Sequence, residues 1–349
     1  MKKSIDILVI NNAPSFYKVN LYNELARHCK LHVIFIALTN QVVISKSFKE
    51  DMKFSYDVLS FVQIEERNRL LSLLRLFGIC NQFNYQKIIY GGYADLEEKV
   101  LMWITPTEKN CLQFESSIRE SRVTGYISIL KKIIFSRFAV ALPSGNLQTA
   151  VFNYLKFSGN IVETKGVGLF NKPTVEKKKN IAHVNELKYL YVGRLIPIKN
   201  LELLIRVFNK TRKSLTIVGD GILKETLKLQ AGSNIKFAGF VPNSEIGELY
   251  GSHDVFVLPS ISEPWGLVVE EAIYFGLPVL VSEAVGCQHE MVVQPNTGII
   301  FSPNNEESLI DAISKLEASI DGYRKNCMEF DFEKRDKEQV NAYLEILSL

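Results

Sequence analysis

The sequence predicts an α/β protein built from two doubly wound domains that face each other across a cleft. Its 349 residues exceed the roughly 250–300 at which a single core stops growing. Short apolar runs alternate with helical stretches in both halves, which is typical of mostly parallel sheets covered by helices. The alternation restarts after a polar, lysine-rich stretch at residues 171–180, which we interpret as a linker.

The first predicted domain covers residues 1–172. Its apolar runs predict strands at residues 5–10, 31–36, 87–90, 111–114 and 138–142, with a helix over residues 17–28. The first run is too short and is interrupted by Asp6, so it predicts a strand rather than a signal peptide. No apolar run approaches the roughly 18 residues of a membrane-spanning helix.

The second predicted domain covers residues 173–330, and residues 331–349 are expected to form a helix that packs back on the first domain. Strands are predicted at residues 189–192, 215–218, 235–237, 255–258 and 279–281. A helix over residues 201–208 is predicted because four apolar residues recur on one face, at Leu201, Leu204, Ile205 and Phe208. Ligands of such sheets bind outside the carboxyl ends of the strands.

Composition narrows the class of protein further. The five cysteines have no C-x-x-C spacing, which disfavours a zinc site or a disulfide framework and fits a reducing cytoplasm. Residues 1–180 contain 25 Lys and Arg against 15 Asp and Glu, a net charge of +10, whereas the remainder carries −7. A basic first half can bind an anionic partner, such as acidic lipid headgroups or a lipid-linked diphosphate. The alternative is that these charges only form a solvated surface and bind no partner. No nucleic-acid-binding motif accompanies the charge.

Two glutamates mark a candidate ligand site in the second half. Glu263 precedes a predicted helix and Glu271 lies about a turn inside it. The first backbone N–H groups of the helix, at Gly266, Leu267 and Val268, can bind an anion between the two carboxylates. A ligand with a sugar, a diphosphate and a ribose has this layout.

Two cations come from the first strand–helix turn of the same half. Gly193 permits a tight turn, Arg194 can bind a diphosphate through two hydrogen bonds, and Lys199 acts as a point charge. Gly219 follows the next strand in a Val-Gly-Asp-Gly turn, which is either a plain structural turn or a place where a nucleotide approaches the backbone.

Together these residues resemble the E-x7-E, V-G-R-L…K-N and V-G-D-G motifs of the retaining GT-B glycosyltransferases of family 4. The resemblance covers residues 188–315 densely. It implies two facing Rossmann-like domains, the first binding the acceptor and the second a nucleotide sugar.

The resemblance also implies roles for the site residues. Arg194 and Lys199 would hold the diphosphate and Glu263 the sugar hydroxyls. Glu271 would hold the ribose, and the backbone at Val241 would border the nucleobase. The family transfers sugars with retention, and the departing phosphate would take the proton of the acceptor. The sequence has no D-x-D motif, so we expect no metal and no cofactor apart from the donor substrate.

The first half resembles the family more loosely. The loop at residues 11–17 and the Gly-Gly-Tyr segment at residues 91–93 match one branch of it. Many members have a histidine near the sugar where this sequence has Glu115, which is therefore either a substitute catalytic residue or a helix cap. Residues 129–138 mix apolar and basic residues, which predicts either a helix on a membrane surface or a core-facing helix.

The sequence thus predicts a metal-independent hexosyltransferase that uses a nucleotide sugar, by default a UDP-sugar. Its expected acceptor is a glycan or a lipid-linked molecule of bacterial surface polysaccharide, such as O-antigen, capsule or lipopolysaccharide. Its expected location is the cytoplasm, at the inner face of the plasma membrane. The alternatives are a nucleotide-sugar 2-epimerase, a glycan phosphorylase, and a catalytically silent subunit that binds the nucleotide sugar.

Overall fold

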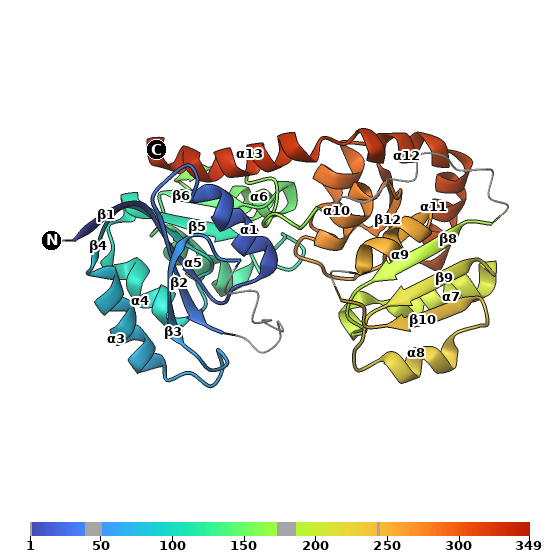
Figure 1. Ribbon diagram of the computed structural model, residues 1–349, viewed down its shortest axis with the longest axis horizontal. Helices are drawn as coiled ribbons and strands as arrows, with labels where there is room; N and C mark the ends of the chain where they lie inside the picture. The colour runs from blue at the N-terminus through green and yellow to red at the C-terminus, as the bar shows by residue number, and fades with distance from the viewer. Residues whose placement is uncertain (1, 39–50, 173–185, 243–244) are drawn as a thin grey trace. The chain divides into compact units, whose positions relative to one another are not determined.

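The computed structural model describes residues 2–38, 51–172, 186–242 and 245–349 of the chain (Figure 1). These residues form two compact units, one made of Met1–Asn171 with Glu333–Leu349 and the other of Lys172–Phe332. Both are parallel α/β units with the doubly wound order, so the predicted fold class is confirmed. Most of the predicted linker, residues 173–180, lies outside the described residues.

Unit 1 contains a parallel sheet in which the described strands follow the order β3-β2-β1-β4-β5-β6-β7. Its strands are β1 Lys3–Asn11, β2 Leu31–Ala37, β3 Ser55–Ser60, β4 Phe83–Tyr90, β5 Asn110–Phe114, β6 Val140–Pro143 and β7 Asn160–Ile161. Its helices are α1 Phe16–Leu25, α3 Arg69–Cys80, α4 Leu96–Ile104, α5 Gly125–Phe135, α6 Asn146–Leu155 and α13 Phe332–Glu345, with short turns η1 Thr107–Lys109 and η4 Ile346–Ser348.

Alternate residues of β1 build two cores, one on each face of this sheet. Leu8 and Ile10 pack with α3, α4, α5 and α6, whereas Ile7 and Val9 pack with α1 and α13. The period of two along a strand produces this division. Helix α13, in red in Figure 1, contributes to this second core, in which its Tyr343 is completely buried.

Unit 2 contains a second parallel sheet, with the described strands in the order β10-β9-β8-β11-β12-β13. Its strands are β8 Lys188–Val192, β9 Ser214–Val218, β10 Ile235–Gly239, β11 Val255–Leu258, β12 Val279–Ser282 and β13 Gly298–Phe301. Its helices are α7 Leu201–Thr211, α8 Lys224–Gln230, α9 Ile246–Ser252, α10 Leu267–Tyr274, α11 Glu306–Ala318 and α12 Ile320–Glu329, with a short 3-10 turn η2 Pro197–Lys199 and a π-helical segment η3 His289–Val293. The predicted apolar face of α7 is completely buried at Leu201, Leu204, Ile205 and Phe208.

Helix α5 bears on both interpretations of residues 129–138. The helix begins at Gly125 and ends at Phe135, which is buried in the core of unit 1, and Ile134 packs against the same core. Ile129, Leu130 and Ile133 are exposed, so the helix faces the core on one side and also has an uncovered apolar side. Within the described part of the chain, no helix combines the length and hydropathy needed to cross a bilayer.

Candidate functional site

The predicted residues of unit 2 gather at the carboxyl ends of β8 and β11, which are neighbours in the sheet. The strand order runs outward from this pair in opposite directions, which makes it the switch point of the sheet. Crevices at such a point are where doubly wound sheets bind ligands. Arg194 and Lys199 follow β8, while Glu263 and the start of α10 follow β11.

The turn after β8 is shaped by Gly193, which has φ 157°. A Cβ atom there would lie 2.7 Å from the hydroxyl oxygen of Tyr191, and that hydroxyl donates a hydrogen bond of 3.1 Å to the carbonyl of Arg194. Asn200, in the left-handed conformation with φ 55°, donates its amide to the carbonyls of Pro259 and Pro303 at 3.2 and 2.8 Å. The cation-bearing turn is therefore fixed to the loop that follows β11.

Lys199 and Glu263, which the sequence predicts as separate ligand-binding groups, form an ion pair with each other. Their side chains are 13% and 15% exposed, so both charges are largely removed from water but compensated. Glu263 is also held by its backbone, because its carbonyl accepts a hydrogen bond of 2.9 Å from the N–H of Gly286. The pair presents a cation and a carboxylate side by side at the switch point.

Glu270 and Glu271 are adjacent in α10 but have different surroundings. Glu270 is completely buried and accepts a hydrogen bond from the indole of Trp265. Glu271 is partly exposed and accepts a hydrogen bond of 3.0 Å from the hydroxyl of Tyr250. Burial, with a smaller contribution from Glu270, raises the pKa of Glu271 to about 7. The first glutamate is thus structural, while the second is a titratable carboxyl at the predicted site.

Close backbone contacts bring together the loops that follow β8, β9 and β10. The N–H of Gly219 donates to the carbonyl of Gly239 at 2.7 Å, and a Cβ atom on Gly219 would lie 1.9 Å from the carbonyl oxygen of Gly193. Val241 lies just beyond β10 and is partly buried. The Val-Gly-Asp-Gly turn therefore has a structural role whether or not a nucleotide approaches it.

The start of α10 is set by Gly266, which has φ 101° and precedes the first helical residue, Leu267. Leu267 and Val268 are both partly buried. Since the first N–H groups of a helix have no partner within it, this end offers donors to an anion. Among the described residues, no group of His, Cys, Asp and Glu side chains is arranged to hold a metal ion.

Unit 1 has a pocket of about 480 Å³ at the switch point of its own sheet. The pocket is lined by the ends of β1 and β5 and by the segments that follow β1, β4 and β5, namely residues 11–15, 17–18, 91–94 and 113–116, together with Ile64. Its walls combine amide, hydroxyl and carboxylate groups with the aromatic side chains of Tyr17, Tyr93 and Phe114. Such a mixture of polar groups and flat apolar faces suits a polyhydroxylated ligand.

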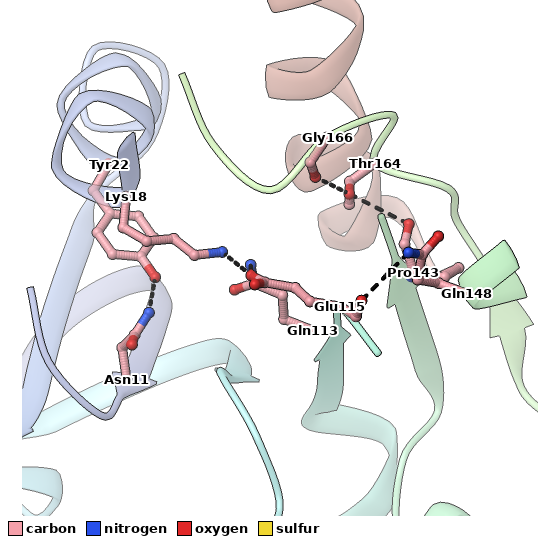
Figure 2. A network of polar contacts seen from close by, with 9 residues as sticks. All are labelled: Asn11, Lys18, Tyr22, Gln113, Glu115, Pro143, Gln148, Thr164 and Gly166. Atoms are coloured by element: carbon pink, nitrogen blue, oxygen red, sulfur yellow. Dashed lines mark hydrogen bonds and ion pairs between the residues drawn. The ribbon is translucent and has the colours of Figure 1, made fainter. Parts of the chain in front are cut away.

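Glu115 lies in this pocket and is paired with Lys18 (Figure 2). Lys18 Nζ lies 2.5 Å from Glu115 Oε1, and the amide of Gln113 donates to the same oxygen at 3.0 Å. The Gln148 amide donates to the backbone carbonyl of Glu115 at 3.3 Å. The helix-cap interpretation of Glu115 is wrong, because the next helix begins only at Gly125.

Two charged residues of this region escaped the sequence analysis. Lys18 is one of the buried residues of α1, and only the fold brings it to Glu115. Glu98 lies behind the pocket wall, where the backbone N–H groups of Gly92, Ala94 and Asp95 hydrogen-bond to its carboxyl. Burial, together with the charge of Asp95, raises the pKa of Glu98 to about 8, so this carboxyl is mostly protonated at neutral pH.

Comparison with known proteins agrees with this geometry. Residues 173–330 match the family model described as glycosyl transferases group 1. An uncharacterised glycosyltransferase of Methanocaldococcus jannaschii is 32% identical over 176 residues, which are 46% of this chain and 45% of that protein. The chain therefore spans less than half the length of this curated relative.

Two solved structures resemble nearly the whole chain. Anabaena HepE in complex with UDP has a TM-score of 0.73 at 17% identity and covers 99% of this chain and 100% of its own. The lipopolysaccharide outer core galactosyltransferase WaaB has a TM-score of 0.73 at 14% identity and covers 97% and 99%. Residues 173–330 thus match the group 1 glycosyltransferases, and the chain as a whole has the fold of the GT-B glycosyltransferases.

Proposed function

We propose that the protein is a retaining glycosyltransferase of family 4. It moves a hexose from a nucleoside diphosphate sugar, by default a UDP-sugar, to a hydroxyl group of a glycan or lipid-linked acceptor. The observation that carries the proposal is the position of Arg194, Lys199, Glu263 and Glu271 around one switch point. UDP bound to HepE supports the choice of donor, and the action of WaaB on lipopolysaccharide supports an acceptor in surface polysaccharide.

In this proposal unit 2 holds the donor. Arg194 and Lys199 bind the diphosphate together with the backbone at Gly266, Leu267 and Val268, and they stabilise the charge that grows on it as the sugar leaves. Glu263 accepts hydrogen bonds from sugar hydroxyls and Glu271 from the ribose. The turns at Gly193, Gly219 and Val241 border the nucleotide.

The Lys199–Glu263 pair adds a feature to this proposal. In the free protein Glu263 holds the ammonium of Lys199 at the switch point. When a diphosphate binds, Lys199 gains a second anionic partner and its ion pair with Glu263 weakens. Glu263 can then accept hydrogen bonds from sugar hydroxyls. The pair therefore prepares both groups for the donor without leaving either charge unpaired.

Unit 1 binds the acceptor in its pocket, with Glu115 as the group nearest to the chemistry. Because Lys18 and Gln113 already donate to Oε1, Glu115 suits the role of an anchored hydrogen-bond acceptor that orients an acceptor hydroxyl. The acceptor oxygen forms the new bond to the anomeric carbon as the bond to the phosphate breaks. The departing phosphate oxygen takes the proton, so the reaction requires no metal and no strong protein base.

The experiment compares donor turnover in R194A and K199M with turnover in K213M. Lys213 is a matched control because it also forms an ion pair, with Glu317 at 2.7 Å. It lies just before β9, at the amino ends of the strands and thus away from the site at their carboxyl ends. We expect kcat to fall about 10²–10³-fold in R194A and K199M and to stay unchanged in K213M, since a lost donor to developing charge costs about this much. Near-normal turnover in both site variants would refute the assignment.

The same assay separates the alternatives. A 2-epimerase releases free sugar without an acceptor, whereas a transferase needs the acceptor for turnover. A silent subunit binds the donor and turns over neither substrate. A thermal-shift panel of nucleotide sugars identifies the donor, because a ligand at 100 times its Kd stabilises the folded state by about 2.7 kcal/mol.

We also propose that the protein works at the cytoplasmic face of the plasma membrane, where a lipid-linked acceptor would be available. The net charge of +10 in residues 1–180 favours contact with anionic headgroups.

A further inference from the structure

The outer face of α5 in unit 1 carries an apolar stripe. Tyr126, Ile129, Leu130 and Ile133 recur at the spacing of one helical face, and their exposed fractions are 74%, 60%, 53% and 48%. Such a stripe normally faces a core. In α5 the buried residue is Phe135, which is not part of the stripe. The stripe is therefore exposed and available to a binding partner.

An exposed tryptophan at the end of α4 contacts the residue that follows the end of α5. Trp103 is 51% exposed, and its ring lies under the guanidinium of Arg137, which follows α5, at 5.1 Å. Arg137 also donates a hydrogen bond of 3.2 Å to the carbonyl of Thr105. This contact ties the two helix ends together and holds an amphipathic indole at the end of α5, a residue type enriched where membranes meet water.

A small basic pocket of about 200 Å³ adjoins the stripe, between the end of α5 and the segment that follows α6. Lys132 and Lys156 line it together with Ser136 and Ser158, over a floor that includes Phe135. No acidic residue lines the pocket, and none occurs in the sequence of α5. Neither lysine forms an ion pair with any residue that the structure describes. Two cations and two hydroxyl groups here match a phosphate.

We infer that this surface docks on a bilayer of anionic phospholipids, with the apolar stripe at the level of the headgroups and a lipid phosphate at Lys132 and Lys156. We call it the α5 face; it comprises Tyr126, Ile129, Leu130, Ile133, Trp103, Lys132 and Lys156. The inference rests on the membrane contact proposed above and names the surface that makes it. Charge complementarity selects the occupant, because an apolar stripe beside cations without acids suits an anionic lipid surface.

Vesicle flotation of the full-length protein tests the inference. Vesicles of phosphatidylcholine alone are compared with vesicles that also contain phosphatidylglycerol, without donor or acceptor, so the result is independent of glycosyl transfer. We expect the protein to float with the anionic vesicles and to stay behind with the neutral ones. Absence from the anionic vesicles, or equal flotation with both, would overturn the inference.

Two double variants probe the two parts of the surface. K132Q/K156Q should weaken partition onto anionic vesicles about 30-fold, the equivalent of about 1 kcal/mol for each basic residue near the surface. I129S/I133S should weaken it at least about tenfold, through lost apolar burial. The charge control is K325Q, which removes an exposed lysine from unit 2, and unchanged partition is expected there.

The control for the apolar change is L229S/V293S, because these two side chains are 89% and 53% exposed in unit 2. It should float like the wild type. All the substituted positions are exposed, so equal melting temperatures are expected and confirm folding. Flotation of I129S/I133S at the wild-type level, or equal loss in L229S/V293S, would contradict the assignment of the surface.

The chain's two tryptophans report the location independently of any loss of binding. Trp103 belongs to the α5 face, whereas Trp265 is 3% exposed in unit 2. Anionic vesicles should shift the emission of the wild type to the blue, and W103F should abolish the shift while it still floats. Flotation of the wild type without an emission shift would show that another surface binds.

Discussion

Replacing Glu271 by glutamine should stabilise the protein at alkaline pH and at the same time weaken its binding of the donor nucleotide. The carboxyl of Glu271 is largely surrounded by protein, and its hydrogen bond from Tyr250 only partly replaces water. Burial raises its pKa from an ordinary value of 4.5 to about 7. Glutamine keeps the size and an oxygen that can accept from Tyr250, but it carries no charge to bury.

The sign of the pH effect follows from linkage. Since the pKa of Glu271 is higher in the folded protein than in the unfolded chain, the folded state binds more protons between pH 4.5 and 7. The contribution of this group to stability is therefore lost as the pH rises through that window. At about 1.4 kcal/mol per tenfold change in proton affinity, the loss is at most about 3 kcal/mol. Solvent screens a partly exposed side chain, so we expect about 1–2 kcal/mol.

Urea unfolding of the wild type and E271Q at pH 5 and pH 8 measures this effect. The variant should gain stability over the wild type as the pH rises, whereas E248Q, which changes an exposed glutamate of α9, should follow the wild type. Calorimetric titration with UDP should show E271Q binding about tenfold more weakly, because hydrogen bonds to a charged acceptor are lost. A stability difference that is the same at both pH values would refute the burial argument. Unchanged UDP affinity would refute the ribose assignment.

Two further pairs of variants test the packing of the sites by urea unfolding. G219A should destabilise the protein by about 2–3 kcal/mol, because the new Cβ would lie 1.9 Å from the carbonyl oxygen of Gly193. The control is G239A, whose Cβ would have no atom within 4 Å. It should lose only about 1 kcal/mol, through backbone strain at φ 75°. Equal losses would argue against the close contact of the loops. K18M should destabilise by about 2–4 kcal/mol because it leaves the Glu115 carboxylate without its cation. E115Q should cost at least as much and also lower turnover, because it leaves the ammonium of Lys18 without its anion, and Lys18 is the more buried partner, 6% exposed against 32%. A clearly smaller loss in E115Q than in K18M would contradict this order.

The elements that the sequence predicts well are those with a strong local pattern. Strand β11 has the predicted bounds, and α7 buries the predicted face, because apolar periodicity records burial directly. Strand β3 was missed, since most of its residues are only partly buried at one side of the sheet and leave no continuous apolar run. Periodicity also records amphipathicity without saying what covers an apolar side, which is why α5 allowed two interpretations: it packs Phe135 in the core and leaves Ile129 and Ile133 exposed.

The residues of the candidate site also fall into those that the sequence could reveal and those that only the fold brings together. Arg194, Lys199 and Glu263 could be found because each follows a predicted strand closely in the sequence, and Glu271 because of its spacing from Glu263. The partnership of Lys18 with Glu115 could not, because it joins segments 97 positions apart through the order of the strands. The pairing of Lys199 with Glu263 was also unforeseen, although both residues were singled out, because spacing in a sequence does not show which side chains meet.

The discontinuity of unit 1 has a consequence for how the chain matures during synthesis. Its second core contains Val340, Ala342, Tyr343 and Ile346 alongside residues of β1 and α1. Unit 2 is continuous from Lys172 to Phe332, so all of its residues leave the ribosome before the first unit can complete its core. The domain that begins the chain is thus the later of the two to be finished, and until then the apolar side of β1 and α1 is open to chaperones.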